Sequence, residues 1–526
     1  MSAAGNTSFF SVNDPRSGLF QDVSSWEWNN YSPFAWQYLP VFMAHTVVFN
    51  LVSKFLPDLP FTIVYTLLSA ATCVYYFTPT LVALSLFEGT LMFAASQYFR
   101  KKVFIWLASL PLLHIIMHHS LMLSDNPFLI YTFVSYSMLS YVSYCMDTIE
   151  KPVRKEDNTV AKQYLRMLFY TFYQPYLFSL IVLYSDFERQ IAERKQKPRD
   201  LLGSLWFALR IAFWWGVLEL ARQIAERKQK PRDLLGSLWF ALRIAFWWGV
   251  LELAVHFMYH ETILRNIEYS EALSKDTYFA LGLTLGIFFH LKYVIIFGLP
   301  SVFARFDNMD PQPGPICISR VMLFSKVWRE FDRGLYQFFK TYIFVPICAP
   351  TFSLPRKIFG VFVSYSFVLL WHGFYHHNIV WIILNIISLL LEMSGLKPYI
   401  VWIILNIISL LLEMSSKALY GVESFRLWRE KVISDVNFRR VLALFQIVPF
   451  AFGLYSNIYF LGGSEVGALF VKRIFDEETI PLRGFVLMLF TLGWFNANVS
   501  MEVDRWNELR RKKDSEKKKL SSKRND

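Results

Sequence analysis

Long apolar runs recur along nearly the whole of this 526-residue chain, and they constrain its fold more than any other feature. About 20 apolar residues in a helix are needed to cross the roughly 30 Å hydrocarbon core of a membrane. Runs near that length predict an all-α, polytopic transmembrane helical bundle with interfacial or re-entrant helices. The candidate spans are 33–55, 60–78, 80–98, 103–123, 127–146, 167–184, 203–221, 236–258, 277–299, 358–375, 379–394, 400–415, 439–460 and 482–500.

The composition agrees with a membrane protein. Hydrophobic residues make up 54% of the chain and charged residues only 18%, whereas about 25% charge is usual in soluble chains. The loops between the runs are too short for a soluble domain, so we expect a single membrane domain over residues 33–504. A polar segment, 1–32, precedes it and lacks the basic and then apolar pattern of a cleavable signal peptide.

A basic tail over residues 505–526 follows the last candidate span. It holds ten lysines and arginines against four aspartates and glutamates, which is half of the net charge of +12. Such a tail is typical of a cytosolic end that obeys the positive-inside rule, so we do not expect nucleic acid as a partner. The end of the tail, Lys523 to Asp526, resembles a basic retrieval signal for the endoplasmic reticulum.

The stretch 301–357 differs from the spans around it, because it is rich in proline and charge. Between the prolines, apolar and charged residues alternate from Arg320 to Phe344 in a pattern that predicts an interfacial helix leading into a re-entrant or short span. Broken backbone at membrane depth is tolerated only where protein or a water-filled cavity buries it. We therefore expect this stretch to contribute to a functional site.

Two segments of the chain are repeated without a single change. Residues 189–221 recur as 222–254, and residues 379–394 recur as 400–415. Solenoid repeats diverge and come in three or more copies, so these pairs indicate a recent duplication or a gene-model artefact. Since one added span inverts everything downstream of it, we expect one copy of each pair to pack poorly or to loop out.

Three clusters of histidine suggest one function. The clusters begin at His114, His256 and His372, and each has a second histidine four residues later. That spacing puts two imidazoles on one helix face, as metal ligation needs, and it resembles the histidine boxes of di-iron membrane desaturases and hydroxylases. Histidines at span ends also sit in the wet interface or bond to backbone carbonyls, so the pattern alone leaves both interpretations open.

A second pattern competes with the histidine boxes. Asp332 lies in a charged segment, and 40 residues later His372 lies in an apolar run beside Gly373. Ionisable groups inside a membrane are costly and are functional candidates, and glycine lets a ligand or another backbone come close. The sequence therefore makes Asp332 and His372 candidate catalytic residues.

The sequence around these residues resembles that of a known family. The segments WREFDRGLYQFFKTYIFVPI (328–347), SYSFVLLWHGFYHHNIVWIILN (364–385) and SNIYFLGGSEVG (456–467) are similar to the membrane-bound O-acyltransferases, and most of all to their hedgehog acyltransferase branch. The family's signature is an apolar-embedded histidine some 30–50 residues after an asparagine or aspartate. Most members carry asparagine there, whereas the hedgehog branch carries aspartate, as this chain does at Asp332.

The resemblance implies transfer of palmitoyl or another long-chain acyl group from acyl-CoA to the N-terminal amine of a secreted signalling protein, such as hedgehog, that begins with cysteine. It implies a multi-pass protein of the endoplasmic reticulum membrane, or of the Golgi, in contact with membrane lipids. As an anion, Asp332 would hold the acceptor's ammonium and take its proton. His372 would act as a general base or donate a hydrogen bond to the thioester oxygen.

Other residues near this pair are weaker candidates. Trp328, one helical turn before Asp332, is a candidate gate, and Lys326 and Arg329 are candidates for contact with the CoA phosphates, although a solvated interfacial face would carry the same charges. Gly373 is a candidate for close approach to the substrate. Cys317 is a candidate haem ligand by the resemblance, since thiolate is a known axial ligand, but it could equally be a small buried hydrophobe or a palmitoylation site.

Several alternatives stay open on the sequence. Within the family, the acceptor could be a serine hydroxyl or a lipid, although Asp332 argues against both because they usually accompany asparagine. The chain could also be a catalytically inactive regulatory relative, which the retained His372 argues against. The di-iron desaturase or hydroxylase remains the alternative from another class.

Overall fold

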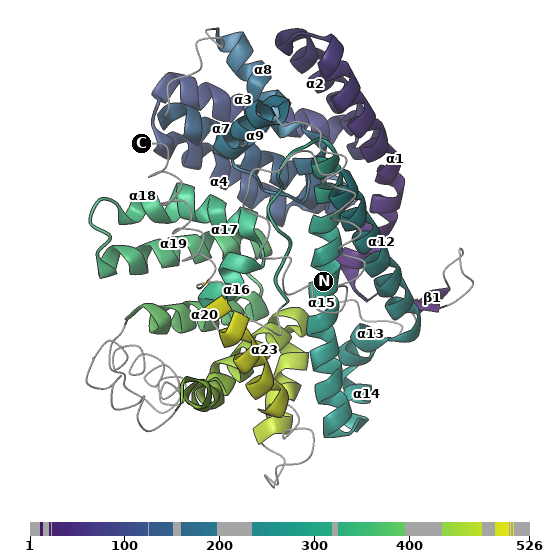
Figure 1. The fold of residues 1–526 in the computed structure, drawn as a ribbon, viewed down its shortest axis with the longest axis vertical. Coiled ribbons are helices and arrows are strands. Elements are labelled where there is room, and N and C mark those ends of the chain that lie inside the picture. The colour runs from purple at the N-terminus through teal and green to yellow at the C-terminus, as the bar shows by residue number, and fades with distance from the viewer. Residues whose placement is uncertain are drawn as a thin grey trace.

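A computed structural model of the chain describes residues 11–13, 20–22, 24–124, 126–150, 159–196, 234–317, 324–394, 434–475, 490–503, 505, 506 and 509. Helices dominate these residues (Figure 1), which confirms the predicted all-α, polytopic class. The described strands are β1 (Ser11–Asn13) and β2 (Phe20–Asp22), which form one short antiparallel hairpin ahead of the helices.

Five described helices are long and apolar enough to cross a membrane, as the recurrent apolar runs predicted. They are α2 (Asp58–Phe77), α3 (Pro79–Phe99), α12 (Leu234–Phe257), α15 (Lys275–Phe306) and α19 (Leu354–His372). Two further apolar helices are shorter, α4 (Lys102–His118) and an apolar stretch inside α20 (His376–Ser394). The chain is thus a multi-pass membrane protein.

The remaining helices differ in length and in regularity. The longest described helix, α23 (Asp435–Phe475), is broken at Gly463, whose φ of +84° and ψ of 178° are not helical. The other elements are α1 (Trp26–Phe55), α5 (Ser120–Leu123), α6 (Pro127–Leu129), a π-helical turn (Ile130–Val134), α7 (Ser135–Glu150), α8 (Val160–Thr171), α9 (Tyr184–Gln196), α13 (His260–Arg265), α14 (Ile267–Ala272), α16 (Phe324–Glu330), α17 (Arg333–Phe339), a π-helical turn (Lys340–Phe344), α18 (Val345–Cys348) and a helical segment over 490–503.

Local sequence explains where several helices begin. Thr78 and Ser274 precede α3 and α15, and their side chains accept hydrogen bonds from the backbone N–H groups of Leu81 and Thr277. Such caps satisfy N–H groups that the first turn of a helix leaves without partners. Proline follows Thr78 at the first position of α3, where its missing N–H is tolerated.

The expected span 167–184 is wrong. Helix α8 ends at Thr171, a 3₁₀ turn spans Gln174–Tyr176, and the chain then runs without helix until α9 begins at Tyr184. Proline at position 175 cannot donate a backbone hydrogen bond and disfavours helix in the residue before it. The segment is nevertheless buried, so its apolar residues face the protein interior rather than lipid.

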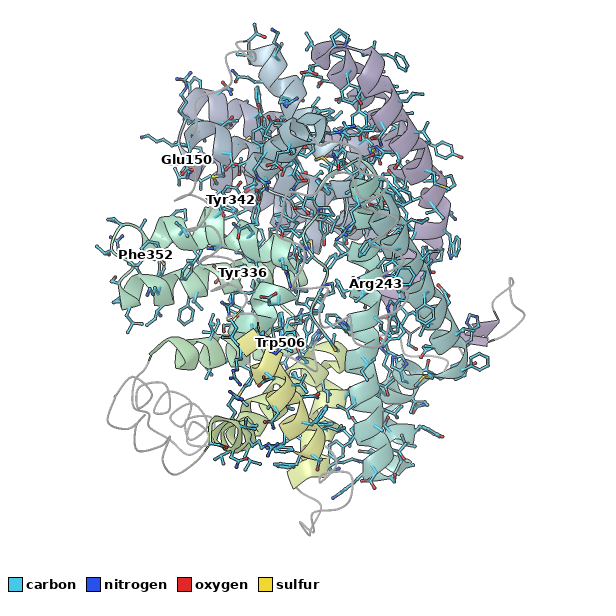
Figure 2. All side chains as sticks on the ribbon, in the orientation of Figure 1. Glu150, Arg243, Tyr336, Tyr342, Phe352 and Trp506 are labelled. Carbon is cyan, nitrogen blue, oxygen red and sulfur yellow. The ribbon has the colours of Figure 1, made fainter. Side chains whose placement is uncertain are left out.

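The predicted interfacial helix from Arg320 to Phe344 forms in two pieces. Helix α16 ends at Glu330, and α17 begins at Arg333 after a bend at Phe331 and Asp332. The α18–α19 turn carries Phe352 at its outer tip, whereas Tyr336 on α17 lies nearer the centre of the molecule (Figure 2). The break in the helix therefore directs the turn that contains Asp332 inward.

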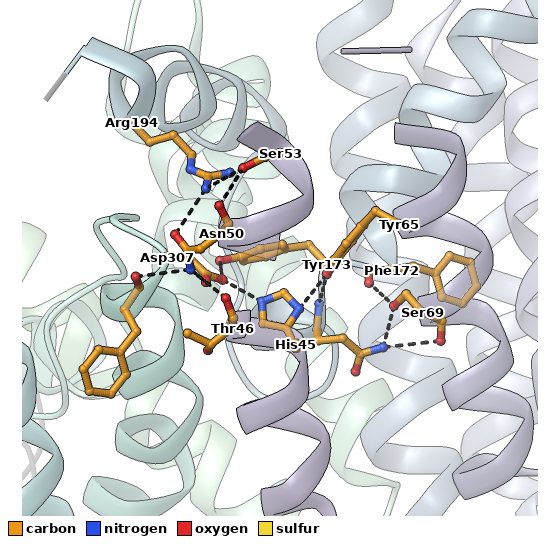
Figure 3. Close-up of polar contacts among 12 residues, drawn as sticks. His45, Thr46, Asn50, Ser53, Tyr65, Ser69, Phe172, Tyr173, Arg194 and Asp307 are labelled. Carbon is orange, nitrogen blue, oxygen red and sulfur yellow. Dashed lines mark hydrogen bonds and ion pairs between the residues drawn. The ribbon is translucent and has the colours of Figure 1, made fainter. Parts of the chain in front are cut away.

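A buried polar network joins α1, α2, the segment after α8 and the end of α15 (Figure 3). The fully buried Asp307 carboxylate accepts hydrogen bonds from His45 Nε2 at 2.6 Å, Tyr173 Oη at 2.7 Å and Asn50 Nδ2 at 2.8 Å. The other ring nitrogen of His45 lies 3.0 Å from Tyr65 Oη. A buried carboxylate is tolerated when it is paired and hydrogen-bonded in this way, so the network fixes these segments against one another.

The first duplication is divided between two described helices. Helix α9 contains the start of the first copy, up to Gln196, and α12 contains the apolar part of the second copy, from Leu234. Residues 197–233 lie outside the described residues, as does the second copy of the other pair at 400–415. The expectation that one copy packs poorly or loops out therefore stays a prediction.

We predict that removing residues 197–229 preserves the fold. This deletion joins Gln196 to Lys230 and leaves one complete copy, so α9 and α12 keep their own sequences. The shortened protein should reach the membrane and show the elution profile and thermal unfolding temperature of the full chain. Removing both copies, 189–254, should abolish folding because α12 is then lost. Aggregation of the first variant would contradict the prediction.

Candidate active site

A cavity of about 1510 Å³ lies between α1, α4, α7, α15, the α16–α17 turn, α19, α20 and α23. Aromatic side chains form much of its wall, and a smaller set of ionisable groups opens into it. Large, mainly apolar cavities with a few convergent polar groups are the usual form of small-molecule sites. The cavity is therefore the place to look for chemistry.

Asp332 lies at the N-terminus of α17 and lines this cavity. Its Oδ1 accepts a hydrogen bond from the backbone N–H of Leu335 at 2.9 Å, so the carboxylate also caps the helix. Burial raises the pKa of the Asp332 carboxyl to about 6, against the opposing effect of the backbone N–H groups of Leu335 and Gly334. A carboxyl with such a pKa changes its charge close to physiological pH.

Gly334 allows the turn at Asp332 to pack closely against a neighbouring segment of backbone. A Cβ atom at this position would collide with the carbonyl oxygen of Ile181, in the non-helical segment before α9. Only glycine lets the two backbones approach this closely. The irregular segment that replaced an expected span therefore forms the support on which the Asp332 turn rests.

His372 is the last residue of α19, and its ring is exposed to the same cavity. The ring lies edge-on to Trp381 and Phe460, with centroids 5.6 and 5.4 Å away, and those two rings stack on each other at 4.1 Å. Edge-to-face contacts of this kind favour one ring orientation. The aromatic wall thus orients the imidazole.

The end of α19 is fixed by its neighbours. Gly373 has φ +85° and ψ 153°, a conformation that only glycine adopts readily. Asn378 Nδ2 donates hydrogen bonds to the carbonyl oxygens of His372 at 2.8 Å and Gly373 at 3.0 Å. These carbonyls would otherwise lack the partners that a continuing helix provides.

The weaker candidates divide into two groups. Trp328 lines the cavity, and its Nε1 donates a hydrogen bond to Asn385 Oδ1 at 3.1 Å. Lys326 and Arg329 lie on the same helix but outside the cavity wall, and Arg329 Nε donates to the carbonyl oxygen of Ser325 at 3.1 Å. The structure therefore places Asp332, His372, Trp328 and Gly373 on the wall of one cavity, and the two cations are not part of that wall.

The structure bears on two hypotheses that involve a metal, the di-iron centre and the haem ligand. All ten histidines belong to the described residues, and within that part of the chain no three histidine, cysteine or carboxylate side chains converge as metal ligands do. Among the described residues, the three histidine clusters are therefore not gathered into one ligand set. Cys317 is half-buried and is followed by residues 318–323, outside the described part, so its assignment as a haem ligand stays a prediction.

Sequence reasoning missed a second group of ionisable residues on the cavity wall. Glu27, at the start of α1, pairs with Lys292 on α15 at 2.6 Å between Oε2 and Nζ, and accepts a hydrogen bond from Tyr293 Oη at 2.9 Å. All three line the cavity. Lysine in the middle of an apolar span was the available signal, whereas Glu27 stood in a polar segment expected to precede the membrane domain.

Comparison with known proteins finds a family match and several relatives for this chain. Residues 153–394, which include Asp332 and His372, match the model of MBOAT, the membrane-bound O-acyltransferase family. The chain is 25% identical to protein-cysteine N-palmitoyltransferase HHAT of Mus musculus over 496 residues, which cover 89% of this chain and 87% of that protein. These matches confirm the resemblance seen in the sequence.

Two further relatives match over shorter regions. The chain is 25% identical to protein-cysteine N-palmitoyltransferase Rasp of Drosophila melanogaster over 343 residues, or 64% of this chain and 56% of that protein. It is 24% identical over 138 residues to a mouse protein named protein-cysteine N-palmitoyltransferase HHAT-like protein, or 26% of this chain and 27% of that protein. The chain thus spans little more than half of Rasp.

We predict that Gly373→Ala lowers the thermal unfolding temperature and displaces His372. The alanine would adopt an unfavourable backbone conformation, at a cost of about 1–3 kcal/mol, and its Cβ would lie 2.9 Å from the ring of Tyr375. Gly249→Ala on α12 is the matched control, because its Cβ meets no atom within 4 Å and alanine favours helix. Equal stability of the two variants, measured by fluorescence in nanodiscs, would contradict the prediction.

Proposed function

We propose that this chain, which residues 153–394 mark as a membrane-bound O-acyltransferase, transfers a palmitoyl or other long-chain acyl group from acyl-CoA to the N-terminal amine of a secreted protein. The observation that carries the proposal is the presence of a carboxylate, Asp332, and an imidazole, His372, on the wall of one large apolar cavity. Both relatives are named protein-cysteine N-palmitoyltransferases, which supports an acceptor that begins with cysteine.

The reaction replaces a thioester with an amide. The acceptor enters as an ammonium, since a free α-amine has a pKa of about 7.7–8.0, and an ammonium is not nucleophilic. Asp332 in its ionised form holds that ammonium and takes one proton from it. An asparagine could hold the ammonium but could not take the proton, which favours an amine acceptor over a hydroxyl or lipid acceptor.

His372 acts on the other reactant. The neutral amine attacks the thioester carbonyl carbon, and the imidazole either removes the second proton from nitrogen or stabilises the charge that develops on oxygen, which contributes roughly 10²–10⁴-fold. The carbon–sulfur bond then breaks, and the second proton goes to the CoA thiolate. The products are the N-acyl protein, free CoA and one proton, which Asp332 returns to solvent.

The setting follows from the substrates. Acyl-CoA is the acyl donor, and the aromatic cavity provides an apolar passage for its chain. A secreted acceptor meets a multi-pass enzyme in the endoplasmic reticulum membrane, or in the Golgi, before export. Haem has no step in this mechanism. If haem is bound, Cys317 would supply a thiolate as its axial ligand.

We predict that the protein acylates a peptide with a free N-terminal cysteine when it is given labelled palmitoyl-CoA, and that it leaves the N-acetylated peptide unmodified. His372→Ala should abolish transfer. Asp332→Asn should lower it by about 10²-fold or more, although asparagine preserves the helix cap. His114→Ala, outside the cavity, should keep full activity. Transfer to a serine hydroxyl or a lysolipid in the same assay, without N-acylation, would instead support the alternative acceptors.

The rate should also depend on pH through Asp332. The carboxyl has a pKa of about 6, so lowering the pH through that value protonates it and removes the group that holds the ammonium. We expect kcat/KM for the free-amine peptide to fall below pH 6 with this apparent pKa. The pH profile of Asp332→Asn should lack this fall in kcat/KM below pH 6, which forms the acidic limb of the profile. An unchanged limb in the variant would assign the titration to another group.

A further inference from the structure

Glu27 is the second carboxylate of the cavity, and the proposed chemistry does not use it. It lies at the start of α1, and 34% of its side chain is exposed, on the cavity wall. One oxygen is paired with Lys292 Nζ at 2.6 Å, and the other accepts the hydroxyl of Tyr293 at 2.9 Å. The carboxylate is therefore held in one orientation while it remains open to the cavity.

Several contacts connect Glu27 to the candidate catalytic pair. The ring of Tyr293 lies 5.3 Å from that of Phe331, the residue next to Asp332. Tyr136 and Tyr293 line the same cavity as Glu27, Asp332 and His372. Glu27 and Asp332 thus border the part of the cavity that Tyr293 and Phe331 line.

We propose that Glu27 is the residue that selects an acceptor with a free, charged N-terminus, an inference that rests on the function proposed above. An ammonium entering an apolar cavity gives up its water and needs a fixed negative charge in exchange. The Glu27–Lys292 pair is neutral as a whole, but it turns its negative end to the cavity, because 34% of the Glu27 side chain is exposed against 10% of Lys292. Lys292 and Tyr293 have already set the orientation of the carboxylate, so little reorganisation accompanies binding. Asp332 remains available to take the proton.

The chemistry of the acceptor explains why a second carboxylate is useful. An ammonium loses two protons on its way to an amide, one before attack and one to the leaving thiolate, whereas a hydroxyl acceptor loses only the proton that reaches sulfur. Once Asp332 has taken the first proton it is neutral and no longer attracts a cation. Glu27 stays ionised through the reaction, because it is paired with Lys292. It can therefore hold the next ammonium on the cavity wall.

The pair has a simpler role as well, because it ties α1 to α15. A purely structural ion pair would not distinguish a charged N-terminus from a capped one. Selection by Glu27 would, since hydrogen bonds between charged groups discriminate strongly against a partner that lacks the charge. The preference for a free amine is therefore the readout that separates the two roles.

The test measures binding without acyl-CoA. A fluorescent peptide with a free N-terminal cysteine and its N-acetylated counterpart are titrated against the full-length protein in nanodiscs. The wild type should prefer the free amine by about tenfold or more, and Glu27→Gln, which keeps one acceptor oxygen and the size of the side chain but not its charge, should lose most of that preference. Glu261→Gln is the matched control, because Glu261 also lines the cavity but pairs with Arg265 on its own helix at 2.8 Å.

Two results would overturn the inference: no preference in the wild type, or the same preference in Glu27→Gln as in the wild type. If Glu27→Gln does not fold, Glu27→Asp, which retains the charge, is compared in its place and should retain the preference; its loss there would also count against the role. Because no acyl group is transferred in these titrations, failure of the proposed acyltransfer would appear separately, in the assay with labelled palmitoyl-CoA.

Discussion

Two acid–base contacts between α1 and α15 hold the framework on which the cavity depends. Glu27 pairs with Lys292, and His45 pairs with Asp307, each at 2.6 Å. The contacts are 18 residues apart on α1 and 15 apart on α15, so the helices run in the same direction and are joined at points about 22–27 Å apart. Because the buried Asp307 carboxylate and the Glu27–Lys292 pair are costly to leave without these partners, sliding of either helix is disfavoured, and the wall formed by α1 and α15 stays in place.

Apolar run length predicted much of the fold, because helix formation in a membrane is governed by length and hydrophobicity. Helices α2, α3, α12, α15 and α19 follow from that rule. The rule failed at 167–184, where the apolar residues fill the protein interior around Pro175 instead of facing lipid. Hydropathy does not distinguish those two environments, so a buried irregular segment and a span have the same pattern in the sequence.

The site shows a similar limit. Asp332 and His372 could be chosen as candidates from the sequence around them, and both line the cavity. Their flanking cations, Lys326 and Arg329, share a short helix with Trp328 but point away from that wall, because a helix of this kind presents alternate faces to the cavity and to the outside. Glu27 becomes a candidate only through its contacts with Lys292 and Tyr293, which lie 265 and 266 residues later in the chain. No local sequence pattern predicts those contacts.

Asp332 is both the base that we propose and the cap of α17, and this combination bears on how acceptor chemistry could change in evolution. Aspartate and asparagine are among the best residues at the start of a helix, so exchanging them at position 332 changes the charge in the cavity while α17 keeps its first hydrogen bond. Many other substitutions would remove the cap as well as the charge. A lineage could therefore move between amine and hydroxyl acceptors at this position through intermediates that still fold, which would make acceptor chemistry easier to change than the scaffold that carries it.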